Sequence, residues 1–286
     1  RVSFANYEIR GNQSIEQIMS RVRDLLEQSR AENAKLIVFP ELWILDALDF
    51  SRDERPQFDR IIREFVPPVL NLVSNFATEN NIYIQAGSFP VYESEDVYNR
   101  SFFFFPDGRK YEQDKVFITP DEKYWGWKEG NKIHVLNTPW GRTVTLTCYD
   151  AEIPIVSSKL ASADIQLLLV PSMTDASGKV RVAWTSQSRA IEHKTYVAVS
   201  GVASRSGNPW ELVGQNLVVG PSQRNFPFNE IANRSVREEG VSLVDLDFGH
   251  LERIRTSGGV FPAQDQRIRN ENEIEVINDE NEGEGQ

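Results

Sequence analysis

Three residues that could do chemistry each accompany a run typical of a strand. Cys148, the only cysteine among the 286 residues, comes directly after the run TVTLT. The alternation of β-branched and apolar residues in this run predicts a strand. Glu41 follows the apolar stretch LIVFP, and Lys115 lies in the run RKYEQDKVF. Functional side chains collect at the ends of strands in layered α/β folds, because loops meet there over the edge of the sheet.

A thiol, a carboxylate and an ammonium group form a complete set for breaking a carbon–nitrogen bond. A thiol with its ordinary pKa of about 8.5 is mostly protonated at neutral pH, so it needs a base or a positive neighbour. The carboxylate can take the thiol proton and pass it to the departing amine, while the ammonium group stabilises the oxyanion of a tetrahedral intermediate. Each residue also has a plainer interpretation: Cys148 as a small buried apolar residue, Glu41 as a surface carboxylate and Lys115 as a solvated hairpin residue.

The three histidines offer no strong alternative to this set. His134, His193 and His250 are scattered singly through the chain, which argues against a histidine-rich metal site. His193 lies at the end of a predicted helix, where packing or capping is the favoured role. Nothing in the sequence favours a papain-like pair of cysteine and histidine, and we expect neither a metal nor an organic cofactor.

The elements that must position these residues alternate between helices and strands. Residues 14–31 form a predicted amphipathic helix that begins with a capping box. Further helices are predicted over about 56–77, with an interruption at its Pro-Pro pair, and over 153–160 and 179–194. Two hairpins with Pro-Asp-Gly and Pro-Trp-Gly turns, and several apolar runs, predict the strands. No linker rich in proline, glycine or serine divides the chain, so we expect one layered α/β domain.

The composition excludes several classes of protein. The chain is 40% hydrophobic and 26% charged, which is typical of a soluble globular protein. No apolar run approaches the ~20 residues that span a bilayer, and no signal-peptide pattern opens the sequence, so we expect no membrane partner. A single cysteine allows no internal disulfide, which favours a reducing, cytoplasmic location.

The net charge of −11 is unevenly distributed along the chain. Residues 271–286 carry seven acids and no base, so that residues 1–270 have a net charge of only −4. We therefore expect a domain over 1–270, followed by an acidic, disordered tail over 271–286. The absence of a basic stripe argues against nucleic acid as a partner.

The sequence blocks around the three reactive residues resemble a known enzyme family. LIVFPEL, DKVFITPDE and TLTCYDAEIP, in that order, are similar to the catalytic blocks of the nitrilase superfamily, the thiol-dependent carbon–nitrogen hydrolases. VPSMTD and RAIEHKTYVAVSG fit as well, so the resemblance covers about residues 1–270. The ending SGGVFPAQDQRIR is similar to a branch that is sometimes fused to an acetyltransferase domain. The resemblance implies a four-layer α-β-β-α sandwich, an α/β fold, and a homodimer or higher homo-oligomer formed through helical faces.

The resemblance also implies a role for each matching residue. Glu41 corresponds to the general base, Lys115 to the oxyanion-stabilising lysine and Cys148 to the nucleophile. Glu122, seven residues after Lys115, falls where many members have a second glutamate that orients the site. The backbone N–H of Tyr149 corresponds to the second oxyanion donor.

The segments next to these residues predict the wall that binds the substrate. The candidates adjoin the second glutamate or follow the apolar run LLLVPS: Tyr124, Trp125, Trp127, Met173 and Thr174. Packing in the core or in a dimer interface explains the tryptophans equally well.

The sequence therefore predicts hydrolysis of a small amide through a cysteine thioester, with release of ammonia or an amine. Tyr149-Asp150 directly after the cysteine resembles amide-cleaving members, whereas nitrile-cleaving members tend to have Trp-Glu there. Two alternatives stay open: a nitrilase that converts a nitrile to the acid, and a catalytically inactive scaffold of the same fold.

Overall fold

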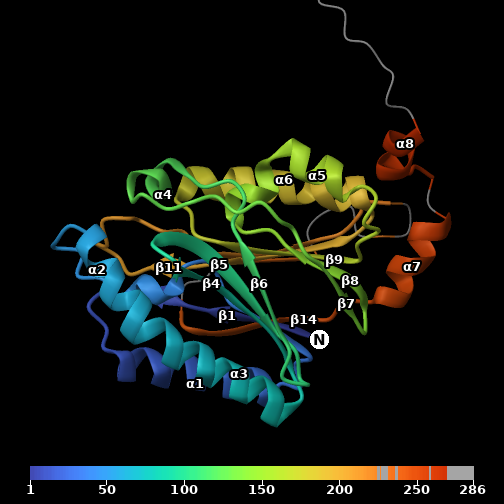
Figure 1. The fold of residues 1–286 in the computed structure, drawn as a ribbon. Helices are drawn as coiled ribbons and strands as arrows, with labels where there is room; N and C mark the ends of the chain where they lie inside the picture. Colours follow the sequence, from blue (N-terminus) through green and yellow to red (C-terminus); the bar gives the residue numbers. More distant parts are fainter. Residues whose placement is uncertain (224–225, 227–230, 236–237, 258, 269–286) are drawn as a thin grey trace, which may run out of the picture.

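Two six-stranded sheets face each other across the middle of the molecule (Figure 1). The computed structural model describes residues 1–223, 226, 231–235, 238–257 and 259–268. In order across the first sheet, the strands are β14 (Gly240–Val244), β1 (Val2–Asn6), β3 (Leu36–Val38), β4 (Tyr83–Glu93), β5 (Asp96–Phe104) and β6 (Lys110–Asp114). In order across the second, they are β13 (Ala232–Ser235), β12 (Gln215–Val219), β10 (Tyr196–Gly201), β9 (Leu167–Ser172), β8 (Gly141–Thr145) and β7 (Val135–Thr138). The two predicted hairpins, β5–β6 and β7–β8, each form one edge of a sheet.

Helices cover the outer faces of both sheets, which gives four layers (Figure 1). One apolar cluster packs α1 (Ile15–Ala31) and α3 (Val66–Asn80) on the first sheet. A second cluster packs α5 (Pro154–Leu160) and α6 (Ala176–His193) on the second sheet. A third fills the space between the sheets with side chains from both inner faces. The architecture is therefore the α-β-β-α sandwich that the sequence predicts.

The first helix shows how local sequence sets an element. The Ser14 side chain accepts a hydrogen bond from the Gln17 N–H, and the Gln17 side chain accepts one from the Ser14 N–H, which is the predicted capping box. Ile18, Val22 and Leu25 are buried on one face of the helix, three or four residues apart. Capping and the apolar stripe both favour the same helix.

The predicted interruption of the second amphipathic stretch is wrong. α2 (Arg55–Arg60), the π-helical turn η2 (Ile61–Phe65) and α3 follow one another without a loop. In η2 the Val66 N–H bonds to the Ile61 carbonyl, five residues back. The proline pair falls in the first turn of α3, where the changed hydrogen-bond register after η2 accommodates the missing N–H groups.

Several short elements gave no periodic signal in the sequence. They are β2 (Glu8–Ile9) with β11 (Ala203–Ser204), the 3₁₀ turns η1 (Trp43–Ala47) and η3 (Cys148–Glu152), and the helices α4 (Pro120–Tyr124), α7 (Phe248–Ser257) and α8 (Pro262–Ile268). Within the described residues, no helix is long and apolar enough to cross a membrane. The acidic segment predicted as a disordered tail, 271–286, lies outside the described residues.

Four strands bring their carboxyl ends to one region of the sandwich. β3 leads to Glu41, β6 to Lys115, β8 to Cys148, and β9 to Met173. β3 pairs in parallel with β4, and β9 lies in parallel between β8 and β10. Side chains far apart in the sequence therefore converge at this end of the two sheets.

Candidate active site

The three residues singled out in the sequence lie together in the interior. The Lys115 ammonium is 2.8 Å from Glu41 Oε1, and both side chains are almost fully buried. The Cys148 thiol neighbours the Glu41 carboxylate, and each group shifts the pKa of the other. The Ser172 hydroxyl lies 3.4 Å from Cys148 Sγ, and Glu41 Oε2 accepts the Met173 N–H at 2.8 Å. The carboxylate is therefore held between the lysine, the thiol and the end of β9.

A second carboxylate completes the buried cluster. Glu122 Oε2 is 2.7 Å from the Lys115 ammonium and also accepts the Thr119 N–H at 2.7 Å. Asn99 donates from its amide nitrogen to Glu41 at 2.9 Å and to Glu122 at 2.6 Å, which links the two carboxylates. Burial opposes ionisation of Glu122, but the neighbouring Lys115 ammonium lowers the pKa of its carboxyl below the ordinary value. The Lys115 ammonium is therefore held by two carboxylates, which Asn99 links to each other.

Cys148 occupies a sharp turn between β8 and α5. It opens η3 with a φ of 48°, a left-handed conformation that residues other than glycine rarely adopt. The turn is anchored by Asp150, whose carboxylate accepts the N–H of Val116 at 3.1 Å and of Phe117 at 2.7 Å. Because these two residues follow Lys115, the turn that holds the thiol is tied to the segment that holds the ammonium group.

Burial governs the ionisation of the cluster. It raises the pKa of the Glu41 carboxyl, and the Lys115 ammonium partly opposes this rise. It also acts against the charged form of Lys115, but the two carboxylates, Glu41 and Glu122, raise the pKa of Lys115 well above its ordinary value. Burial, reinforced by the charge on Glu41, raises the pKa of the Cys148 thiol. The thiol is therefore protonated at rest, beside a carboxylate that can take its proton.

A cavity of about 480 Å³ reaches Cys148. This volume suits a small molecule. Of the residues predicted to form the substrate wall, Tyr124, Trp125, Met173 and Thr174 line the cavity, as does Tyr149, the predicted oxyanion donor. Trp127 does not; it is 4% exposed and packs in the core, with its ring 5.2 Å from that of Phe58. Trp125, in contrast, both packs against the core cluster and lines the cavity.

Sequence reasoning missed three polar residues of the site, Asn99, Thr119 and Ser172. Asn99 lies inside β5, and an asparagine in a strand is itself an unusual feature that could have marked it. Thr119 and Glu122 have the spacing of a capping box, which they form at the start of α4. Ser172 ends an apolar strand and carries no comparable signal.

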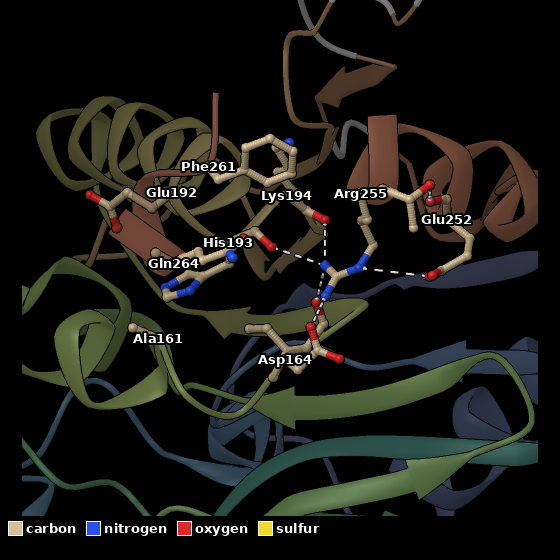
Figure 2. A pocket seen from close by; sticks show the side chains of 12 residues that line it. Ala161, Asp164, Glu192, His193, Lys194, Glu252, Arg255, Phe261 and Gln264 are labelled. Atoms are coloured by element: carbon tan, nitrogen blue, oxygen red, sulfur yellow. Dashed lines mark hydrogen bonds and ion pairs between the residues drawn. The ribbon is translucent and has the colours of Figure 1, made fainter. Parts of the chain in front are cut away.

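A second cavity, of about 190 Å³, is lined by residues of α7 and α8 (Figure 2), and Cys148 is not among its lining residues. Arg255 crosses it and forms an ion pair with Asp164. The same guanidinium donates to the carbonyls of His193 at 3.0 Å and Lys194 at 2.6 Å. The Lys194 ammonium lies 3.3 Å from the centre of the Phe261 ring. The polar groups of this cavity are thus largely occupied by one another.

Curated proteins and a family model match most of this chain. The model described as carbon-nitrogen hydrolase matches residues 1–256. The chain is 28% identical over 274 residues to probable hydrolase YhcX of Bacillus subtilis, covering 93% of this chain and 53% of that protein. It is 25% identical over 261 residues to the chloroplastic omega-amidase of Arabidopsis thaliana, covering 87% of this chain and 68% of the relative. The chain thus spans about half the length of YhcX.

Solved structures share the fold at lower identity. A CN-hydrolase superfamily protein from Xanthomonas campestris has a TM-score of 0.75 and 18% identity, covering 89% of this chain and 93% of that one. An amidase of the nitrilase superfamily from Nesterenkonia has a TM-score of 0.73 and 19% identity, covering 89% and 94%. With the family model matching residues 1–256, the chain belongs to the carbon-nitrogen hydrolase family, within the nitrilase superfamily.

Proposed function

We propose that this protein hydrolyses the carbon–nitrogen bond of a small amide, with Cys148 as the nucleophile and Glu41 as the general base. One observation carries the proposal: a buried carboxylate and a buried ammonium group both adjoin the only thiol, where a cavity reaches it. A solely structural ion pair would need neither the thiol nor the cavity. The omega-amidase relative and the amidase that shares the fold support the same reaction class.

The first half of the reaction forms a thioester. Glu41 takes the proton of the Cys148 thiol as the sulfur adds to the carbonyl carbon of the amide. The oxyanion is stabilised by the Lys115 ammonium and by the backbone N–H of Tyr149. Collapse of the tetrahedral intermediate breaks the carbon–nitrogen bond, and protonated Glu41 gives its proton to the leaving ammonia or amine. Glu122 positions the lysine through their ion pair.

The second half regenerates the enzyme. Glu41 takes a proton from water as the water oxygen adds to the thioester carbonyl, and the same two donors stabilise the second oxyanion. Collapse releases the carboxylic acid and returns the proton to sulfur. Glu41 takes or gives the proton in every proton transfer of this scheme. This agrees with its hydrogen bonds to Lys115, Met173 and Asn99.

The relative rates on an amide and a nitrile test the proposal against the nitrilase alternative. We expect ammonia release from matched pairs, an amide beside the nitrile of the same carbon skeleton, to be faster for the amide. Addition of the thiol to a nitrile gives a thioimidate nitrogen that must be protonated, whereas the ammonium and N–H donors suit an oxyanion. Faster turnover of the nitriles would favour a nitrilase, and no turnover with an unreactive thiol would favour an inactive scaffold.

We also propose that two chains pair through the outer face of α5 and α6. Ile155, Val180 and Trp184 on these helices are 54%, 53% and 77% exposed, which is unusual for large apolar side chains. Sedimentation of the chain measures the oligomeric state. We propose separately that the hydrolase domain comprises residues 1–270 and that the protein acts in the cytoplasm.

A further inference from the structure

Carboxylates dominate the wall of the cavity that reaches Cys148. Four acidic residues line it: Glu54, Asp121, Glu152 and Asp175. Among the described lining residues the single basic one is Arg181, and its guanidinium is 3.0 Å from the Glu152 carboxylate. This pair cancels its own charge. Three negative charges therefore remain on the wall.

The remaining acids come from separate segments, and none has an ion-pair partner within the described part of the chain. Glu54 precedes α2, Asp121 lies in the first turn of α4, and Asp175 caps α6. One oxygen of Asp175 accepts the Gly178 N–H at 2.7 Å, and the residue lines the cavity. Since three separate segments supply these charges, the negative charge is a property of the assembled cavity and not of one acidic stretch.

Neighbouring cations do not neutralise this wall. Arg55 lies over the Tyr124 ring, 4.7 Å from its centre, but its guanidinium is already paired with Asp53 at 2.9 Å. Lys179 lines a separate small hollow and is not part of the cavity lining. The electrostatic potential inside the cavity is therefore negative.

Aromatic rings complete a wall suited to a cation. Trp125 and Trp210 both line the cavity, with ring centres 6.0 Å apart. Phe50 packs edge-on against Trp210 and Phe58 packs edge-on against Trp125, which restricts the motion of both indoles. Indole faces attract ammonium and guanidinium groups, and the attraction adds to that of nearby carboxylates.

We propose that the substrate is an amide whose far end carries a positive charge, an ammonium or guanidinium group. Its carbonyl carbon would lie at the Cys148 sulfur, and its cation between the indole rings and the three unpaired carboxylates. An amide with a terminal carboxylate would meet repulsion from the same wall. The inference rests on the amidase function proposed above and specifies its substrate class.

The charge of the cavity is measured without turnover, because the chain has a single cysteine. Methanethiosulfonates transfer a thioalkyl group to a thiol, forming a disulfide and releasing methanesulfinate. We expect the trimethylammonium-ethyl reagent to label Cys148 at least about tenfold faster than the sulfonato-ethyl reagent, after division by their ratio on 2-mercaptoethanol. Added salt should shrink this preference, because exposed carboxylates are screened.

A matched pair of variants assigns the preference to the wall. Glu54→Gln/Asp121→Asn/Asp175→Asn should reduce the labelling ratio about tenfold towards that of the free thiol. The asparagine at 175 retains a helix-capping oxygen. The control removes three exposed carboxylates outside the cavity, Asp24→Asn/Glu64→Gln/Glu79→Gln, and should leave the ratio as in the wild type. Equal loss in both variants would assign the effect to net charge and overturn the inference.

Turnover then separates this inference from the amidase proposal. 4-Aminobutanamide, 4-hydroxybutanamide and glutaramate share a chain and differ in terminal charge. We expect kcat/KM to fall in that order, by about tenfold or more between the first and the last, and the triple variant to flatten the series. Hydrolysis that is equal or faster for glutaramate would overturn the charge preference and leave the amidase standing. Cation-selective labelling without hydrolysis of any amide would overturn the amidase, and the substrate class with it.

Discussion

Two buried lysines, Lys115 and Lys194, show how partners decide what a charge can do. Their exposed fractions are 2% and 5%. Lys115 lies between two carboxylates, which raise its pKa against the effect of burial. Lys194 has no ion-pair partner in the described ranges and lies over the Phe261 ring (Figure 2). Burial, together with the nearby Arg255 charge, lowers its pKa.

The difference teaches that burial of a cation is a poor sign of function by itself. The Lys115 ammonium is fixed beside a thiol and a cavity that admits a small molecule, so its charge is directed at reacting atoms. Within the part of the chain that the structure describes, the Lys194 ammonium donates one long hydrogen bond, of 3.5 Å, to the Ile254 carbonyl. No thiol is present among the described residues that line the cavity around it. Chemistry is expected at the first cavity and packing at the second.

The largest effect that the comparison predicts is the loss of the thiol. Cys148→Ala should lower amide hydrolysis by at least about 10³-fold, because no thioester can form. The melting temperature should change little, because the substitution removes one atom, the sulfur, from a side chain that lines the cavity. Ammonia release and thermal melting are the measurements. Wild-type hydrolysis by this variant would refute the mechanism.

The two lysines themselves form a matched pair of variants. Lys115→Met leaves two buried carboxylates unpaired, so we expect the free energy of unfolding to fall by about 3–5 kcal/mol and hydrolysis to be lost. Lys194→Met removes a poorly solvated cation and should change the free energy of unfolding by less than about 1 kcal/mol. Denaturant titration measures both.

A double variant separates the effect of Lys115 on stability from its effect on hydrolysis. Adding Glu122→Gln to Lys115→Met removes one of the two unpaired carboxylates, so stability should recover in part while hydrolysis stays lost. Equal destabilisation by the two single lysine variants would contradict the comparison.

The two carboxylates around Lys115 should also differ in their effect on activity. Glu41→Gln removes the base and should reduce kcat by about 10²–10⁴-fold. Glu122→Gln keeps the shape of the side chain but removes its ion pair with Lys115. We expect kcat to fall less, by about tenfold to hundredfold, because the lysine is positioned less well. Steady-state kinetics with circular dichroism as a folding control test the order. The reverse order would exchange the roles of the two residues.

The smallest expected effect is a pH dependence of stability that arises from His193, a residue that lines the second cavity. Burial lowers the pKa of His193 to about 4, and its ring nitrogen lies 2.8 Å from the Ser157 hydroxyl. The unfolded chain, with a histidine pKa of about 6.5, binds a proton first as the pH falls. Stability from neutral His193 is therefore complete above pH 6.5 and is lost progressively between about 6.5 and 4.

Comparison with a variant isolates this contribution from other titrating groups. Between pH 7 and pH 5 the wild type should lose about 2 kcal/mol of unfolding free energy more than His193→Gln does. Urea unfolding at the two pH values provides the difference. If both proteins lose the same amount, His193 does not resist protonation in the folded state.

Local pattern was sufficient for the long elements and for the reactive residue types. The capping box and apolar stripe of α1 specify a helix without help from the rest of the chain. Three ordered blocks indicated Glu41, Lys115 and Cys148, because a thiol, a carboxylate and a lysine after strands are chemically suggestive even before folding. The predicted interruption at the proline pair was wrong because a proline usually weakens a helix, whereas the π turn before this pair accommodates it.

Tertiary structure alone decided which of these groups meet. Asn99 joins the two carboxylates across β5, and Trp125 faces the cavity while Trp127 enters the core, two residues away. Each of the three unpaired acids of the cavity wall is more than fifty residues away from the next along the chain. Sequence determines residue type and local periodicity, but the distance between side chains, and so the shift in their pKa, arises only when the two sheets pack and exclude water.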